Sequence, residues 1–528
     1  MGGCKDSGNF SASSIVLEGM LSRVFSAGLH GIDGFVVRVE LDVARGLPTF
    51  NTVGLPDSSV KEARDRVVSA IRNSGFDFPP RRVIVNLAPA QMRKAGTHLE
   101  LPIGLGILAA LAQVRAGTWC KDTCFLGELA LDGSVRPVRG VLAMASAAKA
   151  RGLRKVVVPK ENLREAAVTG LPARGVSSLG DAVRLIAGEK WAGESAPEAV
   201  ADGAESAAPD GEDLSEVRGQ FLARRALEIA AAGGHNLLMS GPPGAGKSML
   251  ARRLPGILPP LTLEESLEVT RIHSVVGLLR DGEGLLRVRP FRSPHATAST
   301  AAMIGGGPSC RPGEIVLSHR GVLFLDELPE FHRDALEALR QPMEDRRVTV
   351  TRMKEVITYP ADFCLVAAMN PCPCGRSGLS MNPCDCDDAA LRRYRGRVSG
   401  PLLDRLDLRI DLAPLPFKDW AGRDGAPVEP SAAVRARVLA AREKAAARMG
   451  RAGAVNAQLT PRELRKHCEL DSRGMSLLEK CVEKGGLSAR GIGRMLRVGR
   501  TIADLAGAER IETKHMAEAL YYRGMRDG

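Results

Sequence analysis

GPPGAGKSML, residues 241–250, decides the fold of this chain. An apolar segment, HNLLMS, precedes it, and a helical pattern, SMLARRLPGIL, overlaps its end. In this strand–loop–helix context, the N–H groups of a glycine-rich loop wrap phosphate oxygens at a helix N-terminus. The sequence therefore predicts an α/β domain whose nucleoside triphosphate site is formed by Gly241, Pro242, Pro243, Gly244, Ala245, Gly246, Lys247 and Ser248.

Two carboxylates end the next strand pattern. In GVLFLDELPEF, residues 321–331, four apolar residues run into Asp326 and Glu327, as in a Walker B element. We expect Lys247 to reach the β- and γ-phosphates. Ser248 and Asp326 are predicted to hold Mg²⁺, and Glu327 is predicted to polarise the attacking water. The alternative for these carboxylates is an exposed acidic strand end.

More polar and basic side chains follow downstream. A third strand pattern, FCLVAAMN, ends in Asn370, which is predicted to orient the water; the alternative is a turn residue. The basic stretch at 392–412 contains Arg405, our preferred candidate for an arginine that reaches a neighbouring subunit's nucleotide. Arg397 is the second candidate. The alternative for either arginine is an ordinary ion pair.

A further arginine candidate lies in a C-terminal helix. Ser488 is a suitable N-cap, so Arg490 falls in the first turn, where the helix dipole disfavours a cation. A nearby phosphate would explain this position, and Arg490 is therefore predicted to sense the nucleotide. Arg494 is the alternative sensor, and a surface role for Arg490 stays open.

Composition divides the chain into parts. Residues 191–213 are acidic, lack Lys and Arg, and contain few large apolar side chains, which predicts a flexible linker. Before it, residues 1–19 read as a disordered tail and residues 20–190 as an α+β domain. After it, residues 214–425 contain the P-loop pattern, and residues 426–528 are helical throughout.

Several local patterns support this division. GFVVRVELDV and RRVIVNLAP have strand composition, whereas SSVKEARDRVVSAIRNSG has helical spacing that ends at Gly75. ELPIGLGILAALAQV is mostly apolar and predicts a buried helix. In TPREL, Thr460 and Glu463 predict a capping box, and Ser488 and Thr513 are predicted to cap two further helices.

Charge and composition exclude several protein classes. Eleven cysteines in 528 residues are too few for a disulfide scaffold. The chain has neither an apolar signal segment nor an apolar run long enough to span a bilayer, which predicts a cytoplasmic protein. The formal net charge of +12 favours an acidic partner, with nucleic acid the first candidate, although a merely basic protein is the alternative.

Four cysteines crowd together in CPCGRSGLSMNPCDC. Four thiolates can bind Zn²⁺ tetrahedrally, and in a cytoplasmic protein a metal is favoured over disulfides. The C-x-C spacing is tighter than in common zinc knuckles, so a reduced cysteine-rich loop is the alternative. The candidate ligands are Cys372, Cys374, Cys384 and Cys386.

Two features favour DNA as the acidic partner. The segment between Ser248 and Asp326 is longer than a minimal core needs and includes the basic stretch RVRPFRSPHATAS. After Walker B, RRVTVTRMKEVITYP alternates like a hairpin, with Arg352 and Lys354 at its middle. Cations at a hairpin tip can contact DNA phosphates independently of sequence. A solvated hairpin tip is the alternative.

With these motifs in order, the core resembles a magnesium-chelatase-like AAA+ ATPase, and nearly the whole chain resembles the ComM/YifB family. The strings that carry the resemblance include VGLPDSSVKEARDRV, LPIGLGILAAL, LPEFHRDALEALRQPME, MNPCPCG and SGPLLDRLDL. It implies a P-loop core with a helical lid, a homo-hexameric ring with ATP between subunits, and a DNA helicase that promotes branch migration in recombination and natural transformation. PHATAS departs from the family pattern, with Ala296 where a second His is usual.

The N-terminal domain resembles the Lon protease (S5-like) domain in the stretch GELALDGSVRPVRGVLAMASAAKARGLRKVVVPKEN. Lon-type proteolysis needs a Ser nucleophile and a Lys base. Here KAGTHLE places His98 at the nucleophile position, and the base position falls on Leu142. Both members of the pair are absent, which predicts an inactive scaffold.

The leading hypothesis is therefore an ATP-driven hexameric DNA motor. A chelatase-type motor that remodels a protein partner is the first alternative. An ATP-dependent protease and a regulatory ATP-binding module are the others; the lost protease pair argues against the former, and Asp326, Glu327 and Arg405 argue against the latter.

Overall fold

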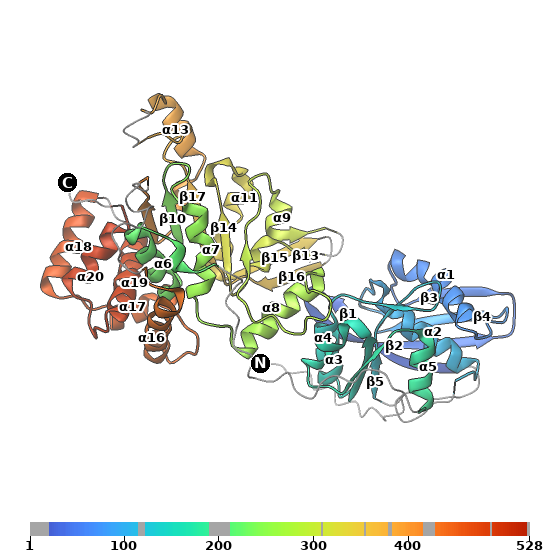
Figure 1. Cartoon of the computed structure of the whole chain (residues 1–528). Coiled ribbons are helices and arrows are strands. Elements are labelled where there is room, and N and C mark those ends of the chain that lie inside the picture. The colour runs from blue at the N-terminus through green and yellow to red at the C-terminus, as the bar shows by residue number, and fades with distance from the viewer. Residues whose placement is uncertain are drawn as a thin grey trace. The chain divides into compact units, whose positions relative to one another are not determined.

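Figure 1 shows the computed structural model of the chain, which describes residues 21–114, 122–189, 212–307, 310–352, 355–377, 383–414, 428–485 and 488–524. The described residues fall into two compact units. The first contains those up to Ala204 together with Ser266–Leu286, and the second contains those of Glu205–Glu265 and Arg287–Gly528. The tail 1–19 and nearly all of the acidic segment 191–213 lie outside the described residues.

A seven-stranded mixed sheet forms the centre of the first unit, in the order β3-β4-β2-β1-β5-β8-β9. β2 pairs antiparallel with β1 and β4, whereas β5, β8 and β9 run parallel. The strands expected from GFVVRVELDV and RRVIVNLAP are confirmed as β2 and β4. The sheet consists of β1 (Leu21–His30), β2 (Asp33–Ala44), β3 (Thr49–Val53), β4 (Arg82–Ala88), β5 (Thr123–Phe125), β8 (Lys155–Pro159) and β9 (Ala173–Val176), and β6 (Glu128–Leu129) pairs separately with β7 (Val135–Arg136).

The two helices that the sequence pattern predicts in this unit are confirmed as α1 and α2, and three further helices accompany them. The side chain of Asp57 accepts a hydrogen bond from the first turn of α1, and Gly75 follows the helix with φ +83°. Every residue of α2 is buried, as its apolar composition requires. The helices are α1 (Ser58–Asn73), α2 (Glu100–Ala110), α3 (Val141–Ala150), α4 (Leu163–Ala167) and α5 (Leu179–Ala187).

The segment Ser266–Leu286 belongs to the first unit, although the sequence predicts it within the core at 214–425. It contains most of α8 (Leu263–Val276). Ser274 of α8 donates a hydrogen bond to the buried carboxyl of Glu165, which also accepts from the backbone N of Leu142 at 2.8 Å. Burial raises the pKa of Glu165. Long-range polar contacts of this kind leave no periodic signal in the sequence.

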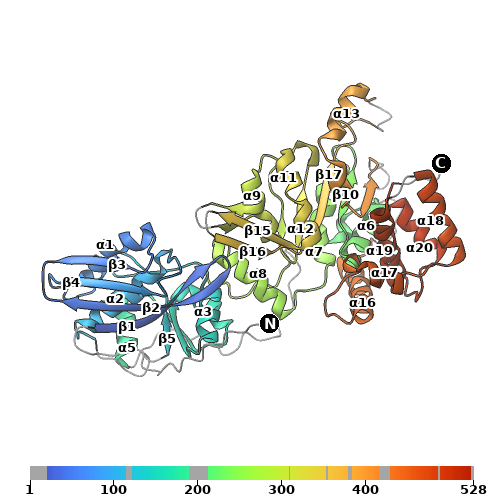
Figure 2. The same ribbon diagram turned by 180° about the vertical axis from the view of Figure 1, so that it is seen from behind.

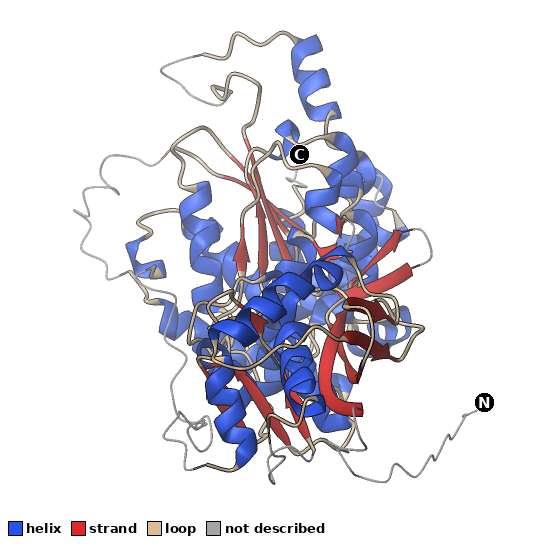
Figure 3. Cartoon of the chain, turned by 90° about the vertical axis from the view of Figure 1, so that its right-hand side faces the viewer, coloured by secondary structure: helices blue, strands red, loops and turns tan. Residues whose placement is uncertain are grey.

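A five-stranded parallel sheet forms the centre of the second unit, in the order β11-β14-β17-β10-β18. All four residues of β14 are buried, because helices cover both faces of a parallel sheet. Figure 3 shows the strands in red flanked by helices in blue. The strands are β10 (Leu237–Ser240), β11 (Phe291–Arg292), β14 (Val322–Leu325), β17 (Cys364–Met369) and β18 (Leu408–Asp411), and α6 (Phe221–Gly233) and α7 (Lys247–Ile257) pack against them.

Shorter elements connect these strands. The hairpin expected after Walker B is confirmed as β15 (Arg347–Arg352) and β16 (Glu355–Pro360), which pair antiparallel and are seen from behind in Figure 2. A second pair joins β12 (Gly305–Gly306) to β13 (Arg311–Pro312). The short helices are α9 (Thr300–Ile304), α10 (Glu314–Leu317), α11 (Arg333–Glu337), α12 (Arg340–Asp345), α13 (Asp388–Gly396) and α14 (Gly400–Leu403).

The described C-terminal residues are helical and gather at one end of the second unit (Figure 1). The capping box of Thr460 and Glu463 and the cap by Ser488 are confirmed. The cap predicted at Thr513 is wrong: Glu512 is the N-cap, and Thr513 is the first helical residue. No described helix combines the length and apolar composition that a membrane crossing requires. The helices are α16 (Ser431–Met449), α17 (Pro461–His467), α18 (Ser472–Gly485), α19 (Ala489–Leu505) and α20 (Thr513–Tyr521).

A buried charge cluster joins α16 and α19. We expect its disruption to cost much of the protein's stability. Asp504, 3% exposed, accepts hydrogen bonds from Arg448 at 3.0 Å, Arg500 at 3.2 Å and Asn456 at 2.8 Å. Asp504→Ala would leave two arginines without their carboxylate, so we expect the free energy of unfolding to fall by about 3 kcal/mol. Chemical denaturation of the full chain measures this change. The control is Glu443→Ala on the exposed face of α16, whose free energy of unfolding should stay within about 0.5 kcal/mol of the wild type. An equal loss in both variants would contradict the prediction.

Candidate active site

The glycine-rich loop lies at the carboxyl edge of the five-stranded sheet. β10 ends at Ser240, the loop occupies 241–246, and α7 begins at Lys247. Gly244 and Gly246 have φ of +79° and +89°, and no atom lies within 4 Å of the position that a Cβ would take on either. This backbone is open on the side where a phosphate can approach the N-terminus of α7.

Lys247 points back across this loop. Its Nζ donates to the carbonyl oxygens of Gly241 at 2.6 Å and Pro242 at 3.0 Å, and to Oδ1 of Asn370 at 3.1 Å. Burial lowers the pKa of Lys247, while the carboxylates of Asp326 and Glu327 act in the opposite sense. The structure thus brings the predicted lysine and the predicted polar strand end into direct contact.

The two carboxylates of the second motif lie at the same edge. Oγ of Ser248 donates to Oδ2 of Asp326 at 2.6 Å, and this hydroxyl–carboxylate pair offers the hard oxygen ligands that Mg²⁺ prefers. Glu327 is exposed and takes a left-handed conformation with φ +52°. Its backbone N donates to Oδ1 of Asp326 at 3.0 Å. The turn therefore separates a carboxylate suited to a metal from one that is free to meet water.

Strand order explains why these side chains meet. β17 lies between β10 and β14 and pairs parallel with both. The carboxyl ends of three adjacent parallel strands therefore carry the P-loop, Asn370, and Asp326 with Glu327. This is where open α/β sheets bind their ligands.

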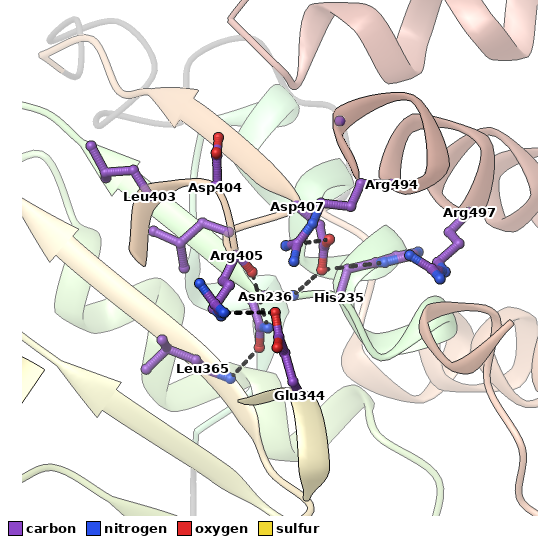
Figure 4. A network of polar contacts seen from close by, with 12 residues as sticks. His235, Asn236, Glu344, Leu365, Leu403, Asp404, Arg405, Asp407, Arg494 and Arg497 are labelled. Carbon is purple, nitrogen blue, oxygen red and sulfur yellow. Dashed lines mark hydrogen bonds and ion pairs between the residues drawn. The ribbon is translucent and has the colours of Figure 1, made fainter. Parts of the chain in front are cut away.

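Arg405 lies at the opposite, amino-terminal edge of the same sheet. Asn236 comes directly before β10; its Nδ2 donates to the backbone O of Arg405 at 3.3 Å, and its Oδ1 accepts from the backbone N of Leu365 at 2.9 Å (Figure 4). The four residues of β10 span about 13 Å between this edge and the P-loop. Arg405 therefore lies at the far end of β10 from the nucleotide loop of its own chain.

Arg405 is buried and held by an acidic partner. It is 8% exposed, and Nη2 lies 2.7 Å from Oε1 of Glu344, at the end of α12. Nη1 donates to the carbonyl of Pro401 at 2.8 Å, whereas Nε has no hydrogen-bond partner among the described residues. The second candidate, Arg397, is about half exposed and pairs with Glu330 at 2.7 Å. Sequence reasoning missed Glu344, because nothing in the local pattern links it to a residue 61 positions away.

Arg405 lines a basic cavity of about 130 Å³ together with Arg494. Nη1 of Arg494 donates to Asp407 at 3.4 Å, and Asp407 also accepts from the backbone N of Asn236 at 3.1 Å. Burial opposes ionisation of Asp407, but His235 and Arg494 outweigh it and its pKa is lowered. Arg490 is exposed and does not line the cavity, so the structure groups the alternative sensor, rather than the preferred one, with Arg405. The arginines of this cavity are Arg289, Arg320, Arg346, Arg405, Arg442, Arg494 and Arg497.

The four clustered cysteines also come together. Their four Sγ atoms all lie within 4.8 Å of one another, and none of the four cysteines forms a disulfide. Cys372 follows Asn370 by two residues and is fully buried. The remaining cysteines outside this cluster that the structure describes are Cys124, Cys310, Cys364, Cys468 and Cys481.

The residues predicted to contact DNA are only partly described. Arg352 is the last residue of β15, although its side chain lies outside the description. Lys354 lies outside the described residues. The hairpin itself is present, with Val356 63% exposed near its turn.

Comparison with known proteins agrees with this arrangement. Residues 213–420 match the family described as magnesium chelatase, subunit ChlI; residues 39–162 match subunit ChlI of Mg-chelatase, and 428–523 match its C-terminal region. The chain is 43% identical to the competence protein ComM of Haemophilus influenzae over 96% of its length and 98% of ComM. It is equally identical to the uncharacterized protein YifB of Escherichia coli, over 96% of this chain and 97% of YifB.

This chain belongs to the ComM/YifB family of magnesium-chelatase-like AAA+ proteins. Membership implies ATPase activity with ATP and Mg²⁺. The oxygens of Ser248 and Asp326 and the open turn at Gly244 and Gly246 fit these ligands. The mixed α/β fold expected from the sequence is thus confirmed.

The first unit of this family member carries a weaker, partial likeness to a protease. The chain is 24% identical to the Lon protease of Chloroflexus aggregans over 29% of its own length and 20% of that protein. At the two positions that the sequence resemblance assigns to the nucleophile and the base, the structure has a buried His98, whose pKa burial lowers to about 4, and a buried Leu142. Leu142 cannot accept a proton, so this pair cannot act as nucleophile and base.

Proposed function

We propose that this chain is one subunit of a cytoplasmic, ATP-driven homo-hexameric ring that translocates on DNA and promotes branch migration during recombination and natural transformation. The single observation that carries the proposal is the division of the ATPase machinery between opposite edges of one sheet. The P-loop, Asp326 and Glu327 occupy the carboxyl edge, whereas Arg405 and Arg494 occupy the amino edge.

This division favours a ring over a monomer. An arginine beyond the far end of a strand of about 13 Å is poorly placed to neutralise charge at its own P-loop. A neighbouring subunit's nucleotide is the partner that fits it, and a chain that presents one half-site on each edge can repeat head to tail into a closed ring.

In such a ring each described residue has a role at the γ-phosphate. Glu327 would polarise the water, Asn370 would orient it, and Lys247 would hold the phosphates. Ser248 and Asp326 would hold Mg²⁺, which supplies charge neutralisation. Arg405 of one subunit, with Arg494 as the more suitably placed sensor than Arg490, would stabilise the charge that develops at the adjoining subunit's nucleotide.

The substrate part of the proposal rests on the hairpin and on the relatives. The Haemophilus influenzae relative is named a competence protein, and by this similarity we propose that the chain acts in transformation. In a ring, the hairpin of β15 and β16 would present Arg352 and Lys354 of every subunit to phosphates. The net charge of +12 agrees with such a partner.

The decisive experiment is the ATPase rate of the full chain alone and with single-stranded, duplex and four-way-junction DNA. We expect DNA to stimulate the rate several-fold in a salt-dependent way. Lys354→Ala should raise the DNA concentration that gives half-maximal stimulation roughly tenfold. Lys444→Ala, which removes an exposed cation from α16, is the control and should leave stimulation unchanged.

An ATPase that depends on Glu327 yet ignores every DNA would contradict the DNA motor. That outcome would instead support the chelatase-type alternative, a motor that remodels a protein partner, which the match to magnesium chelatase already favours as second candidate. Stimulation by junction DNA would lead directly to a branch-migration assay with labelled strands.

A further inference from the structure

The cysteine cluster has the dimensions of a site for one metal ion. Sγ of Cys374 lies 3.3 Å from that of Cys372 and 3.6 Å from that of Cys384, and the Cys384 and Cys372 sulfurs are 3.6 Å apart. A disulfide would need about 2.05 Å. A tetrahedral Zn²⁺ with bonds of about 2.3 Å needs sulfurs about 3.8 Å apart, which is close to what the structure shows.

The surrounding backbone is suited to thiolate ligands. The backbone N of Ser377 donates to Sγ of Cys372 at 3.3 Å, and that of Cys386 donates to Sγ of Cys384 at 3.5 Å. Such N–H donors orient and stabilise sulfur ligands from outside the first coordination sphere. Four sulfurs complete a tetrahedron, so an ion here has no open position for substrate and would be structural.

One turn of the cluster lies directly on the nucleotide loop. Gly375 is buried with φ +75°, and a Cβ built on it would lie 2.8 Å from Cδ and 3.0 Å from Cγ of Pro243. The backbone N of Gly375 donates to the carbonyl of Cys372 at 3.0 Å, which closes the turn that makes this contact. Gly375, the residue after Cys374, therefore connects the cluster directly to the P-loop.

The cluster also lies near Asn370, the polar residue at the strand end of the nucleotide site. Cys372 is two residues beyond Asn370, whose Oδ1 accepts a hydrogen bond from Lys247. Cys386 precedes α13, whose buried Tyr394 lies close to the backbone of Asn370. Both arms of the cluster thus lead to Asn370.

We propose that Cys372, Cys374, Cys384 and Cys386 bind one structural Zn²⁺ and that this zinc site holds Pro243 of the P-loop and Asn370 in their positions for nucleotide binding. The zinc-binding half of the inference is independent of the DNA motor. The second half rests on the nucleotide site described above and not on its use for DNA.

The test measures metal and nucleotide separately. Mass spectrometry of the full chain, purified without chelator, should find about one zinc per chain, and Cys384→Ser should remove most of it. Cys481→Ser, outside the cluster on α18, is the matched control and should retain the metal. With a fluorescent ATP analogue, Kd should rise about tenfold in Cys384→Ser and remain unchanged in Cys481→Ser.

Gly375→Ala separates the metal from the contact with the P-loop. It leaves all four thiols in place but sets a methyl group against Pro243, so we expect zinc to be retained and the Kd for nucleotide to rise roughly tenfold. If the purified chain contains neither stoichiometric zinc nor another bound metal, the proposed metal site is overturned. Zinc loss in Cys384→Ser with an unchanged nucleotide Kd, at unchanged circular dichroism, overturns the bracing role. Neither result depends on whether DNA stimulates the ATPase.

Discussion

Glu327→Gln is expected to lower kcat for ATP hydrolysis at least about 100-fold while leaving the Kd for nucleotide nearly unchanged. The side chain is exposed at the carboxyl edge, one residue beyond the carboxylate that bonds Ser248, and its backbone is left-handed with φ +52°. Glutamine keeps the size and can hold water, but it cannot accept the proton. A coupled phosphate-release assay gives kcat, and a fluorescent nucleotide gives Kd.

The control for this variant is Asp334→Asn. Asp334 is an exposed carboxylate in α11, eight residues after Asp326. Its kcat should stay within about twofold of the wild type. If Glu327→Gln kept more than a tenth of the wild-type rate, another group would have to activate the water.

The sequence was sufficient to predict most of the core, and the reason is local. The strands β10, β14 and β17 are short apolar runs that end in a motif, and each motif is contiguous in the chain. The buried α2 and the capping box at Thr460 are also decided by neighbours within a few residues. Such features depend on periodicity and on side-chain to backbone bonds, which a single sequence contains.

The arginine site could be predicted only in part, because its geometry is long-range. Arg405 was identified from its motif, but its partner Glu344 and the contact with Asn236 come from other elements. The choice between Arg490 and Arg494 depended on which face of α19 meets Asp407. A dipole argument favoured the first turn, whereas packing of α19 directs the second arginine into the cavity.

The grouping of Ser266–Leu286 shows the same limit. The segment has ordinary helical composition, and its assignment to the first unit depends on contacts such as that of Ser274 with Glu165, 109 positions apart. The choice of Thr513 as a cap failed for a smaller reason: the preceding Glu512 accepts the bond that a hydroxyl would have accepted, and Thr513 bonds Asp471 instead.

Arg405→Ala is expected to lower kcat about 1,000-fold with little change in the Kd for nucleotide. The guanidinium lies beyond the amino end of the sheet, where its removal does not disturb the P-loop of the same chain. The comparison variant is Arg397→Ala. Because Arg397 and Glu330 are each about half exposed, their ion pair is worth little, and kcat should stay within about threefold. The reverse ranking of the two variants would make Arg397 the arginine that acts on the nucleotide.

Mixing two inactive chains decides whether Arg405 acts between subunits. Lys247→Ala disables the P-loop but keeps Arg405, and Arg405→Ala keeps the P-loop. In a ring, some interfaces of the mixture pair an intact P-loop with an intact Arg405, so hydrolysis should return to roughly a quarter of the wild-type rate if assembly is random. If Arg405 served its own nucleotide, no chain in the mixture would hold a complete site and the rate would remain at the sum of the two variants. Because Arg405 and the P-loop lie at opposite ends of β10, the structure favours recovery.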